Sequence, residues 1–182
     1  LGVAGVQGWQ VYQRNQAQES SQRFVQAVQL LDKGDTAKGV DALQALSVTG
    51  NVGYRLLADM KLAQVKIKDG DNAAAIALYD KVAGDSSIDG VYRDLASIKS
   101  AYLKLTVGDV AGVEARMAPL AVESNPWRHS AREVLALLAL KAGDTAKAQE
   151  WLRKVADDVA APTAIRGRAA ELLAALENGA KG

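Results

Sequence analysis

The sequence predicts an all-α protein, an α-solenoid of about four helix pairs that ends in a C-terminal capping helix. Two observations support this fold class. Alanine and leucine are abundant among the 182 residues, whereas only 5% are aromatic and three are prolines, a composition that favours helices. In addition, a Gly-Asp dipeptide recurs at positions 34, 70, 108 and 143. A period in the mid-thirties with helical flanks is typical of stacked helix pairs.

Each Gly-Asp dipeptide is expected to form the turn inside a helix pair. Glycine can adopt the left-handed conformation that ends the first helix. The aspartate that follows can cap the second helix by accepting a backbone N–H. Two residues therefore stop one helix and start the next, which makes the two helices antiparallel.

Apolar residues at spacings of three and four predict the helices themselves. Short second helices are expected directly after each Gly-Asp dipeptide. Pro126 suits the first turn of its helix with Asn125 as the cap, and a last helix over residues 162–178 would cover the open end of the stack. The expected first helices span residues 6–32, 52–68, 90–107 and 126–142.

Charge and motifs narrow the functional classes. Lysine and arginine number 22 against 21 acidic residues, so there is no general electrostatic reason to bind nucleic acid. The chain has no cysteine for a disulfide or thiol chemistry. It shows no phosphate loop, nucleophile elbow or metal-ligand spacing.

His129 is interpreted as a surface or packing residue without nearby carboxylates, and Asp157-Asp158 as a solvated helix end. We therefore predict no enzyme, and no catalytic, cofactor-binding or metal-binding residues.

The N-terminal stretch LGVAGVQGWQVYQRNQ begins apolar and soon becomes polar. Its six apolar residues cannot span a bilayer, which takes about 20. Two interpretations are open: a frayed apolar end, or the outer end of a membrane helix that starts before Leu1. In the second, Trp9 and Tyr12 lie at the level of the lipid headgroups. We assign residues 1–12 to the outer end of an anchor helix and residues 13–182 to the repeat domain.

The first helices of such a stack form a concave wall, which is the expected protein-binding surface. The wall is mainly apolar, so a clamp for an acidic peptide terminus is not expected. One hypothesis is a groove for an apolar helix or unfolded segment of a partner. The alternative is a wall filled by another helix of the same chain or by a second copy. The predicted wall residues are Met60, Gln64, Ile67, Ile98, Tyr102, Leu105 and Leu137.

The stretches GDNAAAIALYDKVAG and GDTAKAQEWLRKVAD resemble the tetratricopeptide repeat. That repeat places one small residue in the first helix and another five positions past the turn glycine, where small side chains let the two helices approach closely. Val113 departs from this pattern. The matching residues are Ala27, Ala63, Ala101 and Ala136 in the first helices, and Gly39, Ala75, Val113 and Ala148 after the turns.

The opening GVAGVQGWQVYQRNQAQESSQRFVQAV resembles the membrane exit of the ancillary Sec translocon subunit family, through Gly8-Trp9, Tyr12, Gln16 and the small polar run 17–21. YRLLADMKLAQVKIKDGDNAAAIALYDKV resembles the second repeat of that family. These are bacterial proteins with one N-terminal membrane anchor and a tetratricopeptide-like domain outside the inner membrane.

The resemblance implies a single-pass inner-membrane protein whose repeat domain lies in the periplasm. Its implied partners are translocon subunits and a membrane-anchored periplasmic chaperone, with no cofactor. The alternative is a soluble adaptor or envelope assembly scaffold with a different protein partner. The sequence leaves open the partner's identity, the anchor sequence and the oligomeric state, including a homo-oligomer.

Overall fold

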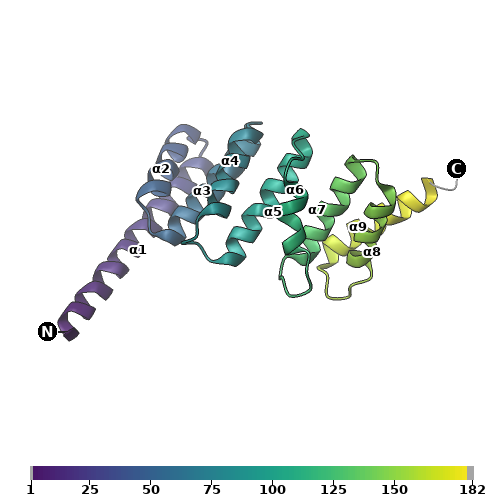
Figure 1. Ribbon diagram of the computed structural model, residues 1–182. Coiled ribbons are helices and arrows are strands. Elements are labelled where there is room, and N and C mark those ends of the chain that lie inside the picture. The colour runs from purple at the N-terminus through teal and green to yellow at the C-terminus, as the bar shows by residue number, and fades with distance from the viewer. Residues whose placement is uncertain (1, 180–182) are drawn as a thin grey trace. The chain divides into compact units, whose positions relative to one another are not determined.

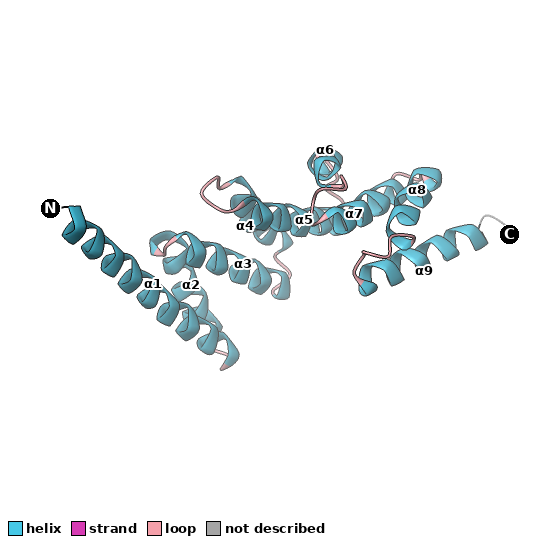
Figure 2. Cartoon of the chain, turned by 90° about the horizontal axis from the view of Figure 1, so that it is seen from below, coloured by secondary structure: helices cyan, strands magenta, loops and turns pink. Residues whose placement is uncertain are grey.

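The computed structural model describes the backbone of residues 2–179 and the side chains of residues 16–178. Over this range every regular element is a helix, as Figure 2 shows: nine α-helices and one short 3-10 helix. The predicted fold class, an all-α solenoid of helix pairs, is confirmed. No helix in the described range is both long enough and apolar enough to cross a membrane.

The chain divides into two compact units, the first ending at Gly90 and the second beginning at Val91 (Figure 1). The boundary that we expect at residue 12 falls inside the first helix and stays a prediction. The side chains of Trp9 and Tyr12 lie outside the described residues, so their expected place at a membrane surface also stays a prediction.

Unit 1 consists of two antiparallel helix pairs. Each helix packs against the next one along the chain, and α1 also contacts α3. The apolar core includes Leu43 and Leu46 from α2 and Leu62 from α3, and the Phe24 and Tyr54 rings meet at its edge with their centroids 6.2 Å apart. The helices are α1 (Gly2–Asp32), α2 (Thr36–Thr49), α3 (Val52–Lys68) and α4 (Asn72–Gly84).

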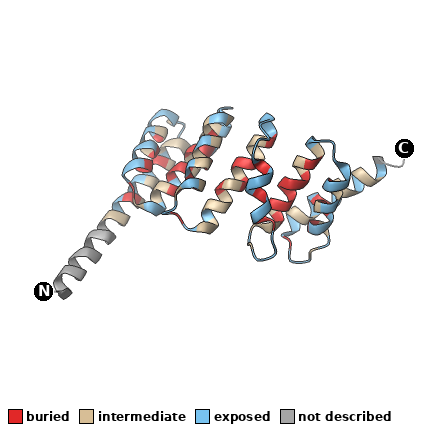
Figure 3. Ribbon diagram, viewed as in Figure 1, coloured by how far each residue is buried: buried red, intermediate tan, exposed pale blue. Residues whose placement is uncertain are grey.

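Unit 2 has two apolar clusters that meet at α7. The first joins Ile98 of α5, Met117 of α6 and Val134 of α7. The second joins Leu152 of α8 to Ala169 of α9. Buried residues accordingly crowd along α7, coloured red in Figure 3. The elements are α5 (Gly90–Val107), α6 (Val113–Met117), η1 (Ala118–Leu120), α7 (Arg128–Lys141), α8 (Thr145–Ala156) and α9 (Thr163–Gly179).

The Gly-Asp turns behave largely as expected. The four glycines have φ between 77° and 85°, the left-handed conformation that ends a helix. Asp71 accepts a hydrogen bond from the backbone N–H of Ala74 at 3.1 Å, and Asp144 caps α8 in the same way. Asp35 makes no cap bond and instead binds the Lys38 ammonium at 2.7 Å, which lowers the pKa of its carboxyl.

The third turn differs from the prediction. Residues 109–112 form a loop, and α6 begins only at Val113, after Gly112 has turned the chain with a second positive φ. The expectation of a helix directly after Asp109 is therefore wrong. Val113, the first residue of α6, is buried in the core, as are the smaller residues Gly39, Ala75 and Ala148 at the same position after the other turns.

The start of α7 is also displaced. We expect Asn125 to cap a helix that begins at Pro126, but the helix begins at Arg128. The Asn125 carboxamide oxygen accepts the Trp127 backbone N–H at 2.8 Å, so it caps the turn that precedes the helix. The Trp127 indole N–H donates to the Val91 carbonyl oxygen at 2.8 Å and holds this turn against α5.

Candidate protein-binding site

The predicted wall residues of unit 1 lie on one face of α3. Gln64 is exposed, Ile67 is 38% exposed and Met60 is half-buried. Leu57, which sequence reasoning missed, continues this face and is 43% exposed. Its position one turn before Met60 was the signal that could have found it. We name Leu57, Met60, Gln64 and Ile67 the α3 stripe.

The surroundings of the α3 stripe are polar and nearly neutral. A shallow hollow of about 380 Å³ borders Gln64 and is lined in part by Lys61, Lys68, Asp32 and Asp69. Two positive and two negative side chains thus surround it. A partner of either charge meets no strong electrostatic barrier here, so the apolar stripe is the feature that offers binding energy.

Unit 2 places its predicted residues differently. Ile98 and Leu105 are 2% and 8% exposed and belong to the core. Tyr102 and Leu137 are half-buried and pack against that core. A shallow groove of about 320 Å³ brings Tyr102, Leu105 and Leu137 together, with Lys141 at its edge. Ile98 does not line this groove.

A polar network lies next to this groove. The Tyr102 hydroxyl on α5 donates to a Glu133 carboxylate oxygen on α7 at 2.5 Å. Arg168 on α9 donates to both oxygens of the same carboxylate, at 2.8 and 2.9 Å. Burial, and next the hydrogen bond to Glu133, raise the pKa of Tyr102, while the bond to Glu133 raises the pKa of Arg168. The network therefore ties α5, α7 and the C-terminal helix α9 together in unit 2.

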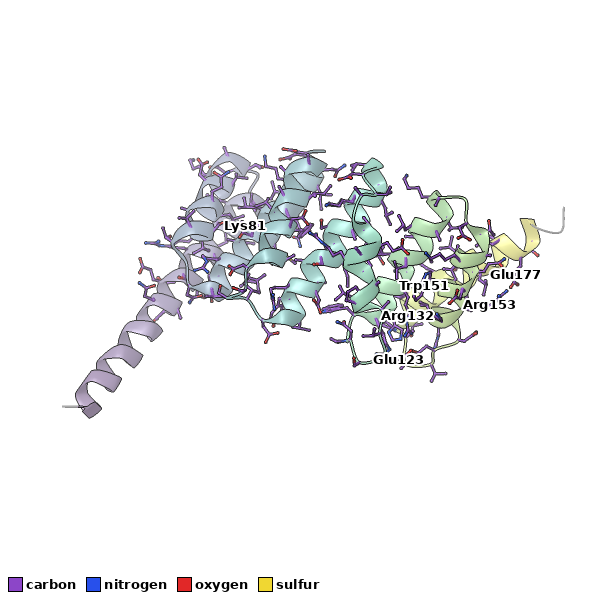
Figure 4. The ribbon with its side chains drawn as sticks, viewed as in Figure 1. Lys81, Glu123, Arg132, Trp151, Arg153 and Glu177 are labelled. Carbon is purple, nitrogen blue, oxygen red and sulfur yellow. The ribbon has the colours of Figure 1, made fainter. Side chains whose placement is uncertain are left out.

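Unit 1 contains a comparable polar bridge. Ser47 on α2 donates to Asp59 on α3 at 2.5 Å, and the Lys81 ammonium on α4 lies 2.9 Å from the other carboxylate oxygen. The ammonium also reaches the Ser47 hydroxyl at 2.7 Å. Lys81, labelled in Figure 4, thus pairs with a carboxylate buried to 3% exposure. This bridge joins three helices of unit 1.

The interpretation of His129 needs a correction. Its Nε2 lies 2.7 Å from Asp158, and the histidine is 5% exposed. The chain that leaves α8 carries Asp158 back to the start of α7, a contact between residues that lie far apart in the sequence. Arg128 is 3.5 Å from the same carboxylate, and the Ala160 backbone N–H donates to it at 2.8 Å. The hydrogen bond to His129 is the main cause that lowers the pKa of Asp158.

The arrangement around Asp158 fixes the loop between α8 and α9 to α7. Arg132 of α7 holds a different segment, the one between η1 and α7. It donates to the Ala121 carbonyl oxygen at 3.0 Å and pairs with Glu123; Figure 4 labels Arg132 and Glu123. Among the residues whose side chains the structure describes, no three acidic or histidine groups gather as metal ligands.

The comparisons with known proteins agree with this geometry. A family model described as a tetratricopeptide repeat-like domain matches residues 1–117. Searches of curated proteins and of solved structures gave no match. The matched range extends from unit 1 through α6 and covers more than half of the 182 residues. The chain therefore belongs to the tetratricopeptide repeat-like domain family.

Proposed function

We propose that this chain is a non-enzymatic protein-interaction module at the bacterial inner membrane, where it works beside the Sec translocon with a periplasmic chaperone. Membership of a tetratricopeptide repeat-like family supports the general role in protein interaction. The resemblance of the N-terminal stretch to the ancillary Sec translocon subunits supports the place and the partners. In this proposal an anchor helix precedes Leu1, and the repeat domain lies in the periplasm.

The observation that carries the proposal is the α3 stripe. Leu57 and Ile67 expose 43% and 38% of their surface on one face of a helix whose remaining faces pack or form ion pairs. On those faces Arg55 lies 3.5 Å from Asp85, and Asp59 pairs with Lys81. Exposed apolar side chains in a row are a common feature of interaction sites.

A partner segment with apolar side chains at helical spacing fits the α3 stripe best. An amphipathic helix can bury Leu57, Met60 and Ile67 with its own apolar face. An unfolded segment of a client that emerges from the translocon offers the same side chains without fixed spacing. The nearly neutral hollow beside Gln64 accepts either kind of segment.

A second candidate is a soluble adaptor or envelope assembly scaffold. The α3 stripe would serve that role equally well, with a different protein as its partner. The two candidates differ in the sequence upstream of Leu1. An apolar stretch of about 20 residues there supports the anchored module, and a hydrophilic upstream sequence contradicts it.

The experiment that tests the proposal is photo-crosslinking in cells from position 67 of the full-length protein. We expect adducts with translocon subunits or a periplasmic chaperone, identified by mass spectrometry. The matched control is position 73, an exposed alanine on α4 outside the stripe. Adducts with other envelope proteins favour the scaffold. Equal yields from both positions contradict the α3 stripe as the binding site, and adducts with only the same protein indicate a second copy as the occupant.

A further inference from the structure

Helix α9 buries fewer of its residues than α7, one of the two helices that it covers. Ala169 is its one buried residue within the described range, whereas α7 carries eight. The larger apolar side chains of α9 are half-buried against Leu152 and Val155 of α8. They are Ile165, Leu172, Leu173 and Leu176, which follow one another at helical spacing. The face beneath α9 is therefore an apolar surface covered by a single amphipathic helix.

The strongest polar contact of α9 is made by Arg168. Glu133, on α7, is 3% exposed, and its carboxylate meets the guanidinium through two parallel hydrogen bonds. This two-pronged geometry is specific to arginine, because a lysine ammonium cannot donate in this planar arrangement. A buried carboxylate without a cation is costly, so the face discriminates in favour of a helix that brings an arginine to this position.

The connection to α9 is suited to release. Asp158 is fixed by His129 and the Ala160 backbone N–H, which holds the preceding chain on α7. Directly after this anchor Val159 is 89% exposed, but Ala161 is buried in the same apolar cluster as Ala169, and α9 begins at Thr163. Undocking of α9 would uncover Ala161 together with the face beneath α9, but it breaks none of the contacts that fix Asp158.

We propose that the face of α7 and α8 beneath α9 is a helix-binding site, with α9 as its resident occupant. A partner helix with the same chemistry, a leucine stripe and one arginine directed at Glu133, takes the place of α9 when α9 undocks. This site lies in unit 2, apart from the α3 stripe, and does not depend on the proposed function.

Hydrogen exchange of the full chain tests the release of α9. In Arg168→Ala we expect the α9 amides to exchange about tenfold faster or more, while the α5 and α7 amides keep their wild-type rates. The matched control is Arg153→Ala. Arg153 of α8 pairs with Glu177 of α9 at 2.9 Å, but both side chains are about half exposed (Figure 4). That variant should change α9 exchange by less than about twofold.

Two results would overturn the proposal. One is unchanged α9 exchange in Arg168→Ala, because Glu133 would then not control docking. The other is an equal increase throughout α5, α7, α8 and α9, since unit 2 would then open as a whole rather than at its cap. Tyr102→Phe separates the two contacts of Glu133, because it removes the tyrosine hydroxyl but keeps both hydrogen bonds from Arg168. It should leave α9 exchange closer to wild type than Arg168→Ala does.

A labelled peptide of residues 162–179 tests occupancy by a separate helix. Added to the full chain, it should bind Arg168→Ala about tenfold more tightly than wild type, because the competing α9 is weakened. A peptide that itself carries Arg168→Ala should lose this binding. Equal affinity for both chains, equal affinity of both peptides, or no binding to either chain would each contradict a helix-binding site.

Discussion

Asp59 of unit 1 and Glu133 of unit 2 are both buried carboxylates, each 3% exposed. Each accepts a hydrogen bond of 2.5 Å from a hydroxyl group, Ser47 in one case and Tyr102 in the other. Each is also paired with a cation whose side chain is about half exposed. These cations are Lys81, at 53%, and Arg168, at 54%.

The two networks differ in where they lie. The Asp59 network joins α2, α3 and α4 and occupies a face of α3 other than the α3 stripe. The Glu133 network joins α5 and α7, the first helices of successive pairs, to the C-terminal helix α9. The α3 stripe of unit 1 is therefore more exposed than the groove beside the Glu133 network, which is lined by the half-buried Tyr102 and Leu137 and the buried Leu105.

The largest expected effect is a loss of stability when a charge is placed at Leu105 in unit 2, compared with the same change on the α3 stripe of unit 1. Leu105→Glu places a carboxylate at an 8% exposed core site, and should lower the free energy of unfolding by about 3–5 kcal/mol. Ile67→Glu is the matched change on the α3 stripe and should stay within about 0.5 kcal/mol of wild type. Urea titration followed by circular dichroism measures both. Similar losses in the two variants would show that Ile67 is also a core residue.

The next largest loss of stability is expected from a larger side chain between the helices of a pair in unit 1, which also tests the repeat register. Ala75 is fully buried between the helices of its pair, so Ala75→Leu should cost about 1–3 kcal/mol. Ala73→Leu, on an exposed side of the same helix, is the control and should be nearly neutral. Thermal unfolding of the two variants measures the difference. Equal midpoints would contradict close packing at Ala75.

Removing a cation from the unit 1 network has a smaller effect. Lys81→Ala leaves Asp59 buried with the Ser47 hydroxyl, and we expect a loss of about 1–3 kcal/mol, moderated by water that reaches the half-exposed lysine site. Lys38→Ala removes an exposed ion pair with Asp35, which solvent screens, and should cost clearly less than Lys81→Ala. Urea titration measures both losses. A larger loss of stability in Lys38→Ala than in Lys81→Ala would contradict the role of the buried carboxylate.

Local sequence signals account for the parts of the fold that were predicted. The expected ranges 52–68 and 90–107 coincide with α3 and α5, because a glycine with positive φ ends each of these helices. The same rule failed at Asp109, because the second glycine, Gly112, moved the start of α6 by a whole turn. A glycine with positive φ ends the first helix of a pair, but where the second helix begins depends on the residues that follow that glycine.

The candidate site was less accessible to sequence reasoning. Helical spacing found Met60 and Ile67, whose exposure depends only on their place along α3. It could not separate them from Leu105, because burial of Leu105 depends on α6 and α7. The contact between Glu133 and Arg168 joins residues 35 positions apart and depends on how α9 docks. Neither residue carries a local signal for that pairing.

The smallest expected effect concerns two loop carboxylates, Asp85 in unit 1 and Asp158 in unit 2. The Ser87 hydroxyl is the main cause that lowers the pKa of Asp85, and His129 is the main cause for Asp158. Both folded-state values lie below the ordinary 3.8, so each carboxylate contributes stability that is fully present above that pH. The contribution is lost as the pH falls through the folded-state value, because the unfolded chain takes up the proton more readily.

Urea titrations at pH 5 and pH 3 measure this contribution in wild type, Asp85→Asn and Asp158→Asn. In a Trp9→Phe background, which removes the one tryptophan of unit 1, tryptophan fluorescence follows unit 2 through Trp127 and Trp151, and circular dichroism follows the whole chain. Each asparagine variant should lose less stability between the two pH values than wild type does, because its amide does not titrate. If Asp158→Asn loses as much fluorescence-detected stability as wild type, the His129 contact does not stabilise the loop that precedes α9. The release of α9 would then start further back along the chain, before Asp158 rather than after it.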